Sequence, residues 1–178
     1  VISDDIAEYI SDTKSPQGLF AEVAIPACSE MPDGRLVLLD GVQDPGNVGT
    51  IIRTAEALGI NGALLSGGCA DVYSPKTLRA SMGSVFRLPC ITCDLSQTII
   101  KLRSAGYSVY GSMLDETAQK LGDICFTDKS AVVIGSEGSG ISDSVKTACT
   151  GGLYIPISGA ESLNAAAAAS IILWELSK

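Results

Sequence analysis

The sequence predicts an α/β fold in which helices flank a mostly parallel, six-stranded sheet. From Arg35 onward, short apolar runs alternate with amphipathic stretches, a pattern that is typical of an α/β sandwich. Glycines also follow several of the amphipathic stretches, as they commonly do where helices end. The expected strands are the apolar runs 36–39, 63–65, 86–91, 108–110, 131–134 and 153–157.

Four helices are expected between or after these strands. Gly59 and Gly106 are predicted to end the first two of them. The last helix contains five consecutive alanines, which favour a helix and allow another helix to approach closely, and either Ser162 or Asn164 could cap its start. The four expected helices are 48–58, 95–104, 142–148 and 163–176.

Residues 1–34 do not follow this alternation. The stretch 11–18 is rich in turn-forming residues, and Pro26 and Pro32 interrupt the chain again. We therefore expect 1–34 to be a linker or leading arm and 35–178 to form one folded domain. The chain begins with Val1 instead of methionine, which suits a fragment of a longer protein or a processed product.

The composition argues against a membrane or secreted protein. No uninterrupted apolar run approaches the roughly 20 residues that span a bilayer, and the first residues lack the pattern of a signal peptide. The expected location is the cytoplasm, with an organellar matrix or stroma as the alternative.

The formal net charge of −8 is unusual for a domain that holds nucleic acid by charge alone. Any RNA contact would have to be local or supplied by another part of the protein. Arg53, Lys76, Arg79 and Arg87 lie in the first half of the chain, and they could form a positive patch or be scattered, solvated charges.

Histidine is absent, which excludes catalysis by Ser-His or Cys-His pairs and any metal site that uses imidazole. Six cysteines without a secretory signal are expected to be reduced thiols. Cys90 and Cys93 have CxxC spacing, but residues three apart in a strand point to opposite faces of the sheet and cannot share a metal. We therefore expect no metal.

The first of three polar motifs follows the strand 36–39. Asp44 and the proline after it make a turn, glycines permit close approach of the backbone, and Asn47 can cap the next helix. Arg53 would lie in the first turns of that helix, near the edge of the sheet where α/β folds bind ligands. Its guanidinium could hold a phosphate with two hydrogen bonds or could simply be a surface charge.

The second and third motifs follow two later strands. Residues 135–140 form a glycine-rich turn that contains one carboxylate, Glu137, and could expose backbone N–H and C=O groups to a ligand. Ser162 and Asn164 stand before the last helix, where a capping or hydrogen-bonding role is more credible than nucleophilic catalysis. An ordinary tight turn and an ordinary helix cap are the alternatives.

In this order and at these spacings, the motifs resemble those of the SpoU, or TrmH-like, RNA 2′-O-ribose methyltransferases of the SPOUT class. The resemblance extends from Leu36 to Leu176 and includes the segments 74–76 and 79–84. The matching positions are Asp44, Pro45, Asn47, Gly49, Arg53 and Thr54 in the first motif; Gly135, Glu137, Gly138 and Gly140 in the second; and Pro156, Glu161, Ser162, Leu163 and Asn164 in the third.

The resemblance implies a C-terminal trefoil knot, which is an exception to the rule that connections do not thread through loops. It also implies that the knotted loops bind S-adenosyl-L-methionine, with backbone contacts at Gly135, Ile155 and Leu163. Gly138 and Gly140 would belong to the same cofactor loop. The family is typically homodimeric, with the active site near the subunit interface, and the alanine-rich last helix suits such packing.

By the same resemblance, Arg53 is the catalytic candidate for transfer of a methyl group to a ribose 2′-hydroxyl of rRNA or tRNA. It would either accept the hydroxyl proton with help from a phosphate or, as we prefer, fix the phosphate and stabilise the developing oxyanion. Asn47, Glu137, Ser162 and Asn164 would orient the ribose, the cofactor loop or the arginine.

The chain departs from this family in two places. Relatives often have Val and Ser within the alanine run 165–169, so the detailed packing of the cofactor pocket could differ. Residues 10–25 resemble the exit from an N-terminal RNA-binding domain that this chain lacks, and substrate choice would then lie outside the chain.

Two other functions compete with the methyltransferase. One is a catalytically silent RNA-binding or assembly module with the same fold, although the presence of Arg53, Glu137, Ser162 and Asn164 argues against it. The other is a dinucleotide-dependent oxidoreductase, but the first strand-to-helix turn lacks the G-x-G-x-x-G fingerprint.

Overall fold

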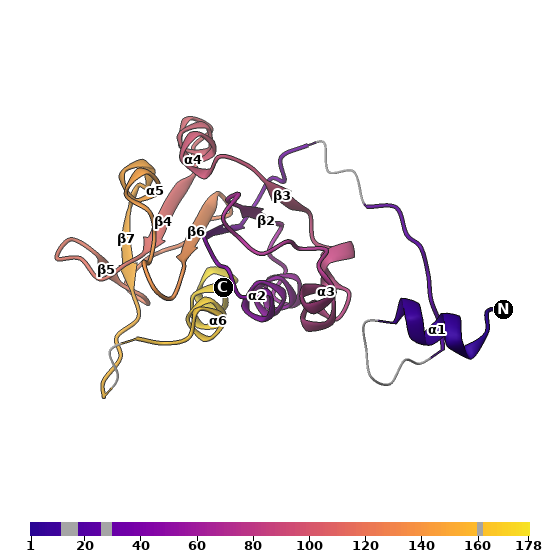
Figure 1. Ribbon diagram of the computed structural model, residues 1–178. Helices are drawn as coiled ribbons and strands as arrows, with labels where there is room; N and C mark the ends of the chain where they lie inside the picture. Colours follow the sequence, from indigo (N-terminus) through magenta and orange to yellow (C-terminus); the bar gives the residue numbers. More distant parts are fainter. Residues whose placement is uncertain (12–17, 26–29, 160–161) are drawn as a thin grey trace.

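The computed structural model describes residues 1–11, 18–25, 30–159 and 162–178. Its centre is a fully parallel sheet in the order β3-β2-β1-β6-β4-β7-β5 (Figure 1). The predicted parallel α/β architecture is confirmed, but the predicted number of six strands is wrong, because the sheet has seven. The strands are β1 Leu36–Asp40, β2 Gly62–Leu65, β3 Cys90–Thr92, β4 Ser108–Ser112, β5 Gln119–Lys120, β6 Ser130–Gly135 and β7 Gly151–Tyr154.

The additional strand, β5, consists of two exposed polar residues that pair with β7 at the edge of the sheet. No apolar run marks it, because an exposed edge strand buries neither face. Two predicted strands also have different bounds. Phe86 belongs to a short 3₁₀ helix, η1 (Ser84–Phe86), and β7 ends before Ile155 and Pro156, where proline offers no backbone N–H for strand pairing.

The helices agree more closely with the sequence. Asp44, Ser74, Asp94 and Asn164 each accept a hydrogen bond from the first turn of the helix that follows them. The last of these resolves the choice of cap for the alanine-rich helix in favour of Asn164. The helices are α1 Asp4–Ile10, α2 Pro45–Ala57, α3 Pro75–Ser81, α4 Leu95–Ser104, α5 Asp143–Ala148 and α6 Ala165–Leu176.

Gly59 and Gly106 follow α2 and α4 with positive φ angles of 73° and 89°, which confirms them as the predicted stops. Two helices were not predicted. The helix α3 starts with a capping serine and Pro75 at its first position, a local signal that could have revealed it. The helix α1 lies within the expected arm, 1–34.

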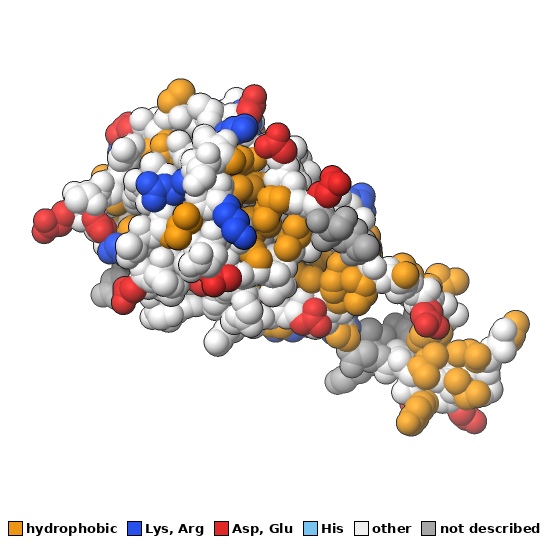
Figure 2. Space-filling view, turned by 90° about the horizontal axis from the view of Figure 1, so that it is seen from above, with side chains coloured by type: hydrophobic (Ala, Val, Ile, Leu, Met, Phe, Trp, Pro, Cys, Tyr) orange, Lys and Arg blue, Asp and Glu red, His pale blue; other side chains and the backbone are white. Residues whose placement is uncertain are grey.

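None of the residues of α1 is buried. In Figure 1 this helix lies apart from the sheet, and Figure 2 shows hydrophobic side chains on the surface of this part of the chain. Ile6, Tyr9 and Ile10 of α1 are at least half exposed. None of the helices among the described residues is long and apolar enough to cross a bilayer.

Two apolar cores cover the two faces of the sheet. The helices α2, α3 and α6 lie on one face, whereas α4 and α5 lie on the other (Figure 1). Cys90 packs against the first core and Cys93 against the second, so the two thiols of the CxxC do face opposite sides of the sheet.

The order of the strands brings the motifs together. β1 and β6 are neighbours, and Asp40 at the end of β1 is in register with Gly135 at the end of β6. All the strands are parallel, so the loops that follow β1, β6, β4 and β7 leave from the same edge of the sheet. The first motif follows β1, the second follows β6 and the third follows β7.

Candidate active site

A cavity of about 430 Å³ lies at this edge of the sheet. Four of the residues predicted to bind a cofactor, Gly135, Gly140, Ile155 and Leu163, line it, whereas Gly138 does not. Glu137 lines it as well. The walls therefore come from the segments after β6 and β7, which are separated in the sheet only by β4.

The glycine-rich turn is closed by its own backbone. Ser136 and Gly140 exchange two backbone hydrogen bonds, with N–O distances of 3.1 and 3.0 Å. Gly140 has a φ of +67°, and a Cβ atom added to Gly135 would lie 2.2 Å from the carbonyl carbon of Gly140. A Cβ at Gly138 would meet no atom within 4 Å. The close backbone contact at Gly135 therefore requires glycine, whereas the position of Gly138 does not.

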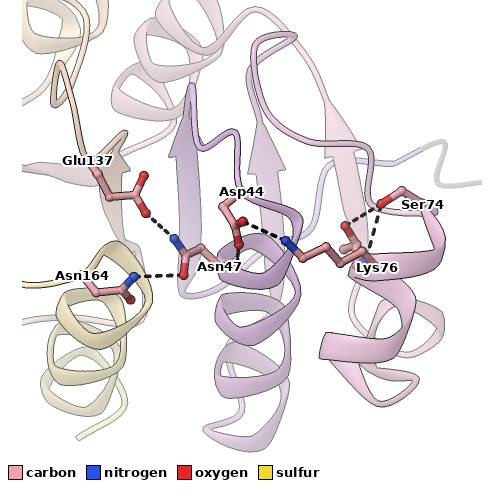
Figure 3. A network of polar contacts seen from close by, with 7 residues as sticks. Asp44, Asn47, Ser74, Lys76, Glu137 and Asn164 are labelled. Carbon is pink, nitrogen blue, oxygen red and sulfur yellow. Dashed lines mark hydrogen bonds and ion pairs between the residues drawn. The ribbon is translucent and has the colours of Figure 1, made fainter.

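Asn47 joins the three motifs through its side-chain amide (Figure 3). Its Nδ2 donates a hydrogen bond to Oε1 of Glu137, and its Oδ1 accepts one from Nδ2 of Asn164 at 3.2 Å. Oδ1 of Asn164 in turn accepts the backbone N–H groups of Ala166 and Ala167 at the start of α6. Three segments that are distant in the sequence thus meet at one amide, beside the cavity.

The cap of α2 differs from the one suggested by the sequence. Asp44 accepts the backbone N–H of Asn47 at 2.9 Å, so the side chain of Asn47 is available for the other two motifs. Nζ of Lys76 on α3 donates to the second carboxylate oxygen of Asp44 at 3.0 Å (Figure 3). These two donors lower the pKa of the Asp44 carboxyl below its usual value, and Lys76 has the larger effect.

Arg53 lies on α2, two turns after the start of the helix, and is exposed. It has no hydrogen-bond or ion-pair partner in the part of the chain that the structure describes, whereas Arg87 is paired with Glu56 at 2.9 Å. An exposed guanidinium without a protein partner remains available to an anion. Lys76 and Arg87 of the basic group each have a carboxylate partner, so they are not free charges.

The third motif is only partly described. Ser162 is exposed and lines the cavity, as Leu163 does, whereas Glu161 lies outside the described residues. Of the five predicted catalytic residues, the structure connects Asn47, Glu137 and Asn164 by hydrogen bonds and places Ser162 on the cavity wall. Arg53 does not contact this network directly.

Sequence reasoning missed the third wall of the cavity. Ser112, the last residue of β4, and Met113 and Leu114 after it line the cavity, as does Lys146 on α5. The predicted strand 108–110 could have identified this segment, because the residues after a parallel strand lie at the ligand edge of the sheet. Nothing in the local sequence indicates Lys146, which reaches the cavity from the body of a helix.

Lys146 forms an ion pair with Asp115, with an N–O distance of 3.0 Å. The backbone N–H and the hydroxyl of Thr117 also donate to this carboxylate, and together with Lys146 they lower the pKa of Asp115 far below its usual value. This pair connects α5 to the segment that follows Leu114. It therefore fixes the third wall against the helix after the glycine-rich turn.

The described residues contain no cluster of three or more metal-ligating side chains. Burial raises the pKa of the Cys149 thiol to about 11, so this cysteine is protonated at neutral pH and is a poor nucleophile. The polar groups available at the cavity wall are therefore carboxylates, hydroxyls and one lysine.

Comparison with known proteins gives the same family from sequence and from structure. The SpoU rRNA methylase family matches residues 34–174. The chain is 36% identical over 177 residues to the 23S rRNA (guanosine(2553)-2′-O)-methyltransferase RlmP of Bacillus subtilis. It is 37% identical over 183 residues to a 23S rRNA (uridine(2479)-2′-O)-methyltransferase of Streptomyces viridochromogenes. The chain spans 71% of the first relative's length and 64% of the second's.

Solved structures are similar over most of the chain. A TrmH-family protein from Porphyromonas gingivalis is 40% identical, with a TM-score of 0.82 over 95% of this chain and 69% of its own. An AdoMet-bound rRNA methyltransferase from Sinorhizobium meliloti is 36% identical, with a TM-score of 0.76 over 82% of this chain and 56% of its own. With the family match and the near-complete coverage by relatives, these similarities show that the chain belongs to the SpoU rRNA methylase family.

Proposed function

We propose that this chain transfers a methyl group from S-adenosyl-L-methionine to a ribose 2′-hydroxyl of RNA, with rRNA or tRNA as the substrate. The observation that carries the proposal is the junction at Asn47, where one amide holds all three motifs beside a cavity of ligand size. The relatives from B. subtilis and S. viridochromogenes are named as 2′-O-methyltransferases of 23S rRNA, which favours rRNA.

The cavity suits the proposed methyl donor. Its volume of about 430 Å³ falls in the range of roughly 300–1,000 Å³ that is usual for small-molecule sites. Apolar side chains such as Met113 and Leu153 line it, and they could cover an aromatic ring. The carboxylates of Glu137 and Asp143 also line it and would complement the positive charges of the donor. When bound, S-adenosyl-L-methionine would supply a methyl group on a positively charged sulfur, leaving S-adenosyl-L-homocysteine as a neutral thioether, and the proton of the ribose hydroxyl would pass to water.

The protein's own residues would act by positioning and by charge. Arginine keeps its proton at neutral pH, so Arg53 is a poor general base, and we assign it to the phosphate of the target nucleotide and to the oxyanion that develops at its ribose. Asn47 would keep Glu137 and Asn164 in fixed positions, because its amide engages both. Ser162, at the cavity wall, would orient the ribose. Holding the two reactants in line can supply much of the rate enhancement.

The proposal includes a knotted C-terminal segment, with 35–178 as the catalytic domain and 1–34 as an arm that follows an RNA-binding domain in the whole protein. Ile155 and Leu163 line the same cavity as Met113 and the glycine-rich turn. The segment that leads into α6 therefore lies against the loops through which a trefoil knot would pass, which supports this part of the proposal.

We also propose that the protein is a homodimer and that α6 contributes to its interface. Ala167, Ile171 and Trp174 are exposed and follow one another at helical spacing on one face of α6. Ile171 is 42% exposed and Trp174 is 57% exposed. This helix packs beside α2, which carries Arg53, so an interface here would lie close to the proposed catalytic residue.

The dimer can be tested by placing a charge on this face. Ile171→Arg is expected to convert the dimer to a monomer, because an unpaired charge is costly in an apolar interface. Light scattering coupled to size-exclusion chromatography measures the mass. Ile100→Arg is the matched control, because Ile100 is similarly exposed at 50% but lies on α4, on the opposite face of the sheet. A monomeric wild type, or equal masses for Ile171→Arg and wild type, would contradict the proposed interface.

The function is tested first by calorimetric titration with S-adenosyl-L-methionine and, separately, with NAD. Binding of the methyl donor alone is expected. Unmodified transcripts of 23S rRNA and of tRNA are then incubated with the protein and the donor, and 2′-O-methylnucleosides are measured by mass spectrometry. Donor binding without methyl transfer to either RNA would favour the silent module, and NAD binding would favour the oxidoreductase.

A further inference from the structure

The structure contains a buried carboxylate near the cavity that none of the three motifs includes. Asp40 is the last residue of β1, and only 8% of its surface is exposed. Its Oδ2 accepts two hydrogen bonds from one residue, Ser142: one from the backbone N–H at 2.8 Å and one from the hydroxyl at 2.7 Å. No motif of the sequence indicates this contact, because 102 positions separate the two residues.

Ser142 is the N-cap of α5, yet its side chain makes no capping hydrogen bond to that helix. Its hydroxyl donates to Asp40 instead. A side chain that would ordinarily cap its own helix is therefore bonded to the end of β1. This attachment fixes the point where the chain leaves the glycine-rich turn and enters α5.

Both ends of the glycine-rich turn are thus bonded to the same strand, β1. Gly135, where the turn begins, is in register with Asp40 through the pairing of β1 with β6. Ser142, just past the end of the turn, is bonded to the side chain of Asp40. Between these two attachments lie Glu137, Gly140 and Ile141, which line the cavity.

We propose that Asp40 is a positioning residue for binding of the methyl donor, acting through Ser142 to hold the turn 135–141 in the conformation that forms the cavity wall. The inference depends on the proposed function, because it assigns the methyl donor to this cavity. Asp40 itself does not line the cavity, so its effect would be on the affinity of the donor and not on the chemical step.

A matched contact elsewhere in the chain provides the control. Asp94 caps α4 and, like Asp40, accepts one backbone N–H and one serine hydroxyl, from Gln97 at 3.1 Å and from Ser96 at 2.7 Å. Neither Asp94 nor Ser96 lines the cavity. Asp94→Asn therefore removes the same kind of charge from a similar pair of hydrogen bonds without affecting the glycine-rich turn.

The experiment compares Asp40→Asn, Ser142→Ala, the double variant and Asp94→Asn. We expect Asp40→Asn to raise the Kd of S-adenosyl-L-methionine about 10-fold, the equivalent of a weakened charge-assisted hydrogen bond. The KM for the donor should rise in parallel, while kcat at saturating donor and the KM for RNA stay near wild type. The double variant should bind the donor no more weakly than Asp40→Asn alone, because the two changes break the same contact.

Hydrogen exchange gives a readout that does not depend on the donor. The amides of 136–142 should exchange faster in Asp40→Asn than in wild type, and Asp94→Asn should leave them unchanged. If Asp40→Asn does not fold, Ser142→Ala still tests the inference, because Ser142 is exposed. Loss of its hydroxyl should raise the Kd of the donor about threefold.

The outcomes separate this inference from the proposed function. A wild type that does not bind the donor overturns both. A wild type that binds it, with an unchanged Kd and unchanged exchange at 136–142 in Asp40→Asn, overturns only the role of Asp40. A Kd that rises equally in Asp94→Asn would show a general loss of stability and would also overturn it.

Discussion

Arg53→Ala is expected to lower the rate of methyl transfer at least about 100-fold, which is the usual effect of removing a group that stabilises charge in a transition state. The affinity for S-adenosyl-L-methionine should stay close to wild type, because Arg53 does not line the cavity. The two quantities are measured by single-turnover transfer to RNA and by calorimetry. Thermal stability should change little, since the side chain is exposed and has no partner among the described residues.

Two further variants sharpen this test. Arg53→Lys keeps the charge but loses the two parallel hydrogen bonds of a guanidinium, so it should recover only part of the activity. Lys101→Ala removes an exposed basic residue from α4, on the opposite face of the sheet, and should leave the rate unchanged. A large loss of donor affinity in Arg53→Ala would contradict the role assigned to this residue.

Gly135→Ala is expected to abolish donor binding over the accessible concentration range. The new Cβ would lie 2.2 Å from the carbonyl carbon of Gly140 and 2.5 Å from its oxygen, and both are backbone atoms that cannot rotate away. The turn would have to open, which would displace the wall of the cavity. Overpacking of this kind also costs roughly 1–3 kcal/mol of stability, so a lower melting temperature is expected. Calorimetry and thermal denaturation measure the two effects.

The matched control for Gly135→Ala is Gly138→Ala in the same turn. A Cβ at Gly138 would meet nothing within 4 Å, and its φ is not in the left-handed region. Donor affinity and melting temperature should therefore stay near those of the wild type. If both variants lost affinity equally, the effect would come from general stiffening of the turn and not from the contact between Gly135 and Gly140.

Much of the fold could be predicted because local signals were strong. Gly59 and Gly106 end helices as the sequence indicated, and the buried strands β1 and β6 contain the continuous apolar runs 36–39 and 131–134. The missed elements lack such signals. The strand β5 is polar and exposed, and it forms by pairing with the edge of β7. The capping serine and Pro75 of α3 were visible in the sequence, so that omission was avoidable.

The candidate site could be predicted as a set of motifs but not as a set of contacts. The turn chemistry of the first motif suggested that Asn47 caps a helix, whereas Asp44 takes that role and leaves the amide of Asn47 to join Glu137 and Asn164. The neighbouring loops determine which of the two polar residues caps the helix and which one bonds to the other motifs. Those neighbours depend on the order of the strands in the sheet, and local sequence does not indicate that order.

The position of β6 in the sheet has a consequence for how the protein folds. Leu36 of β1 pairs with Ala131 of β6, which in turn separates β1 from β4. The middle of the sheet cannot close until most of the chain has been synthesised, and such non-local pairing makes folding slow. The cavity depends on the segments after β6 and β7, so it forms among the last parts of the molecule. A ligand of this cavity would therefore bind only chains that have completed folding, and it would stabilise the finished state without accelerating the earlier steps.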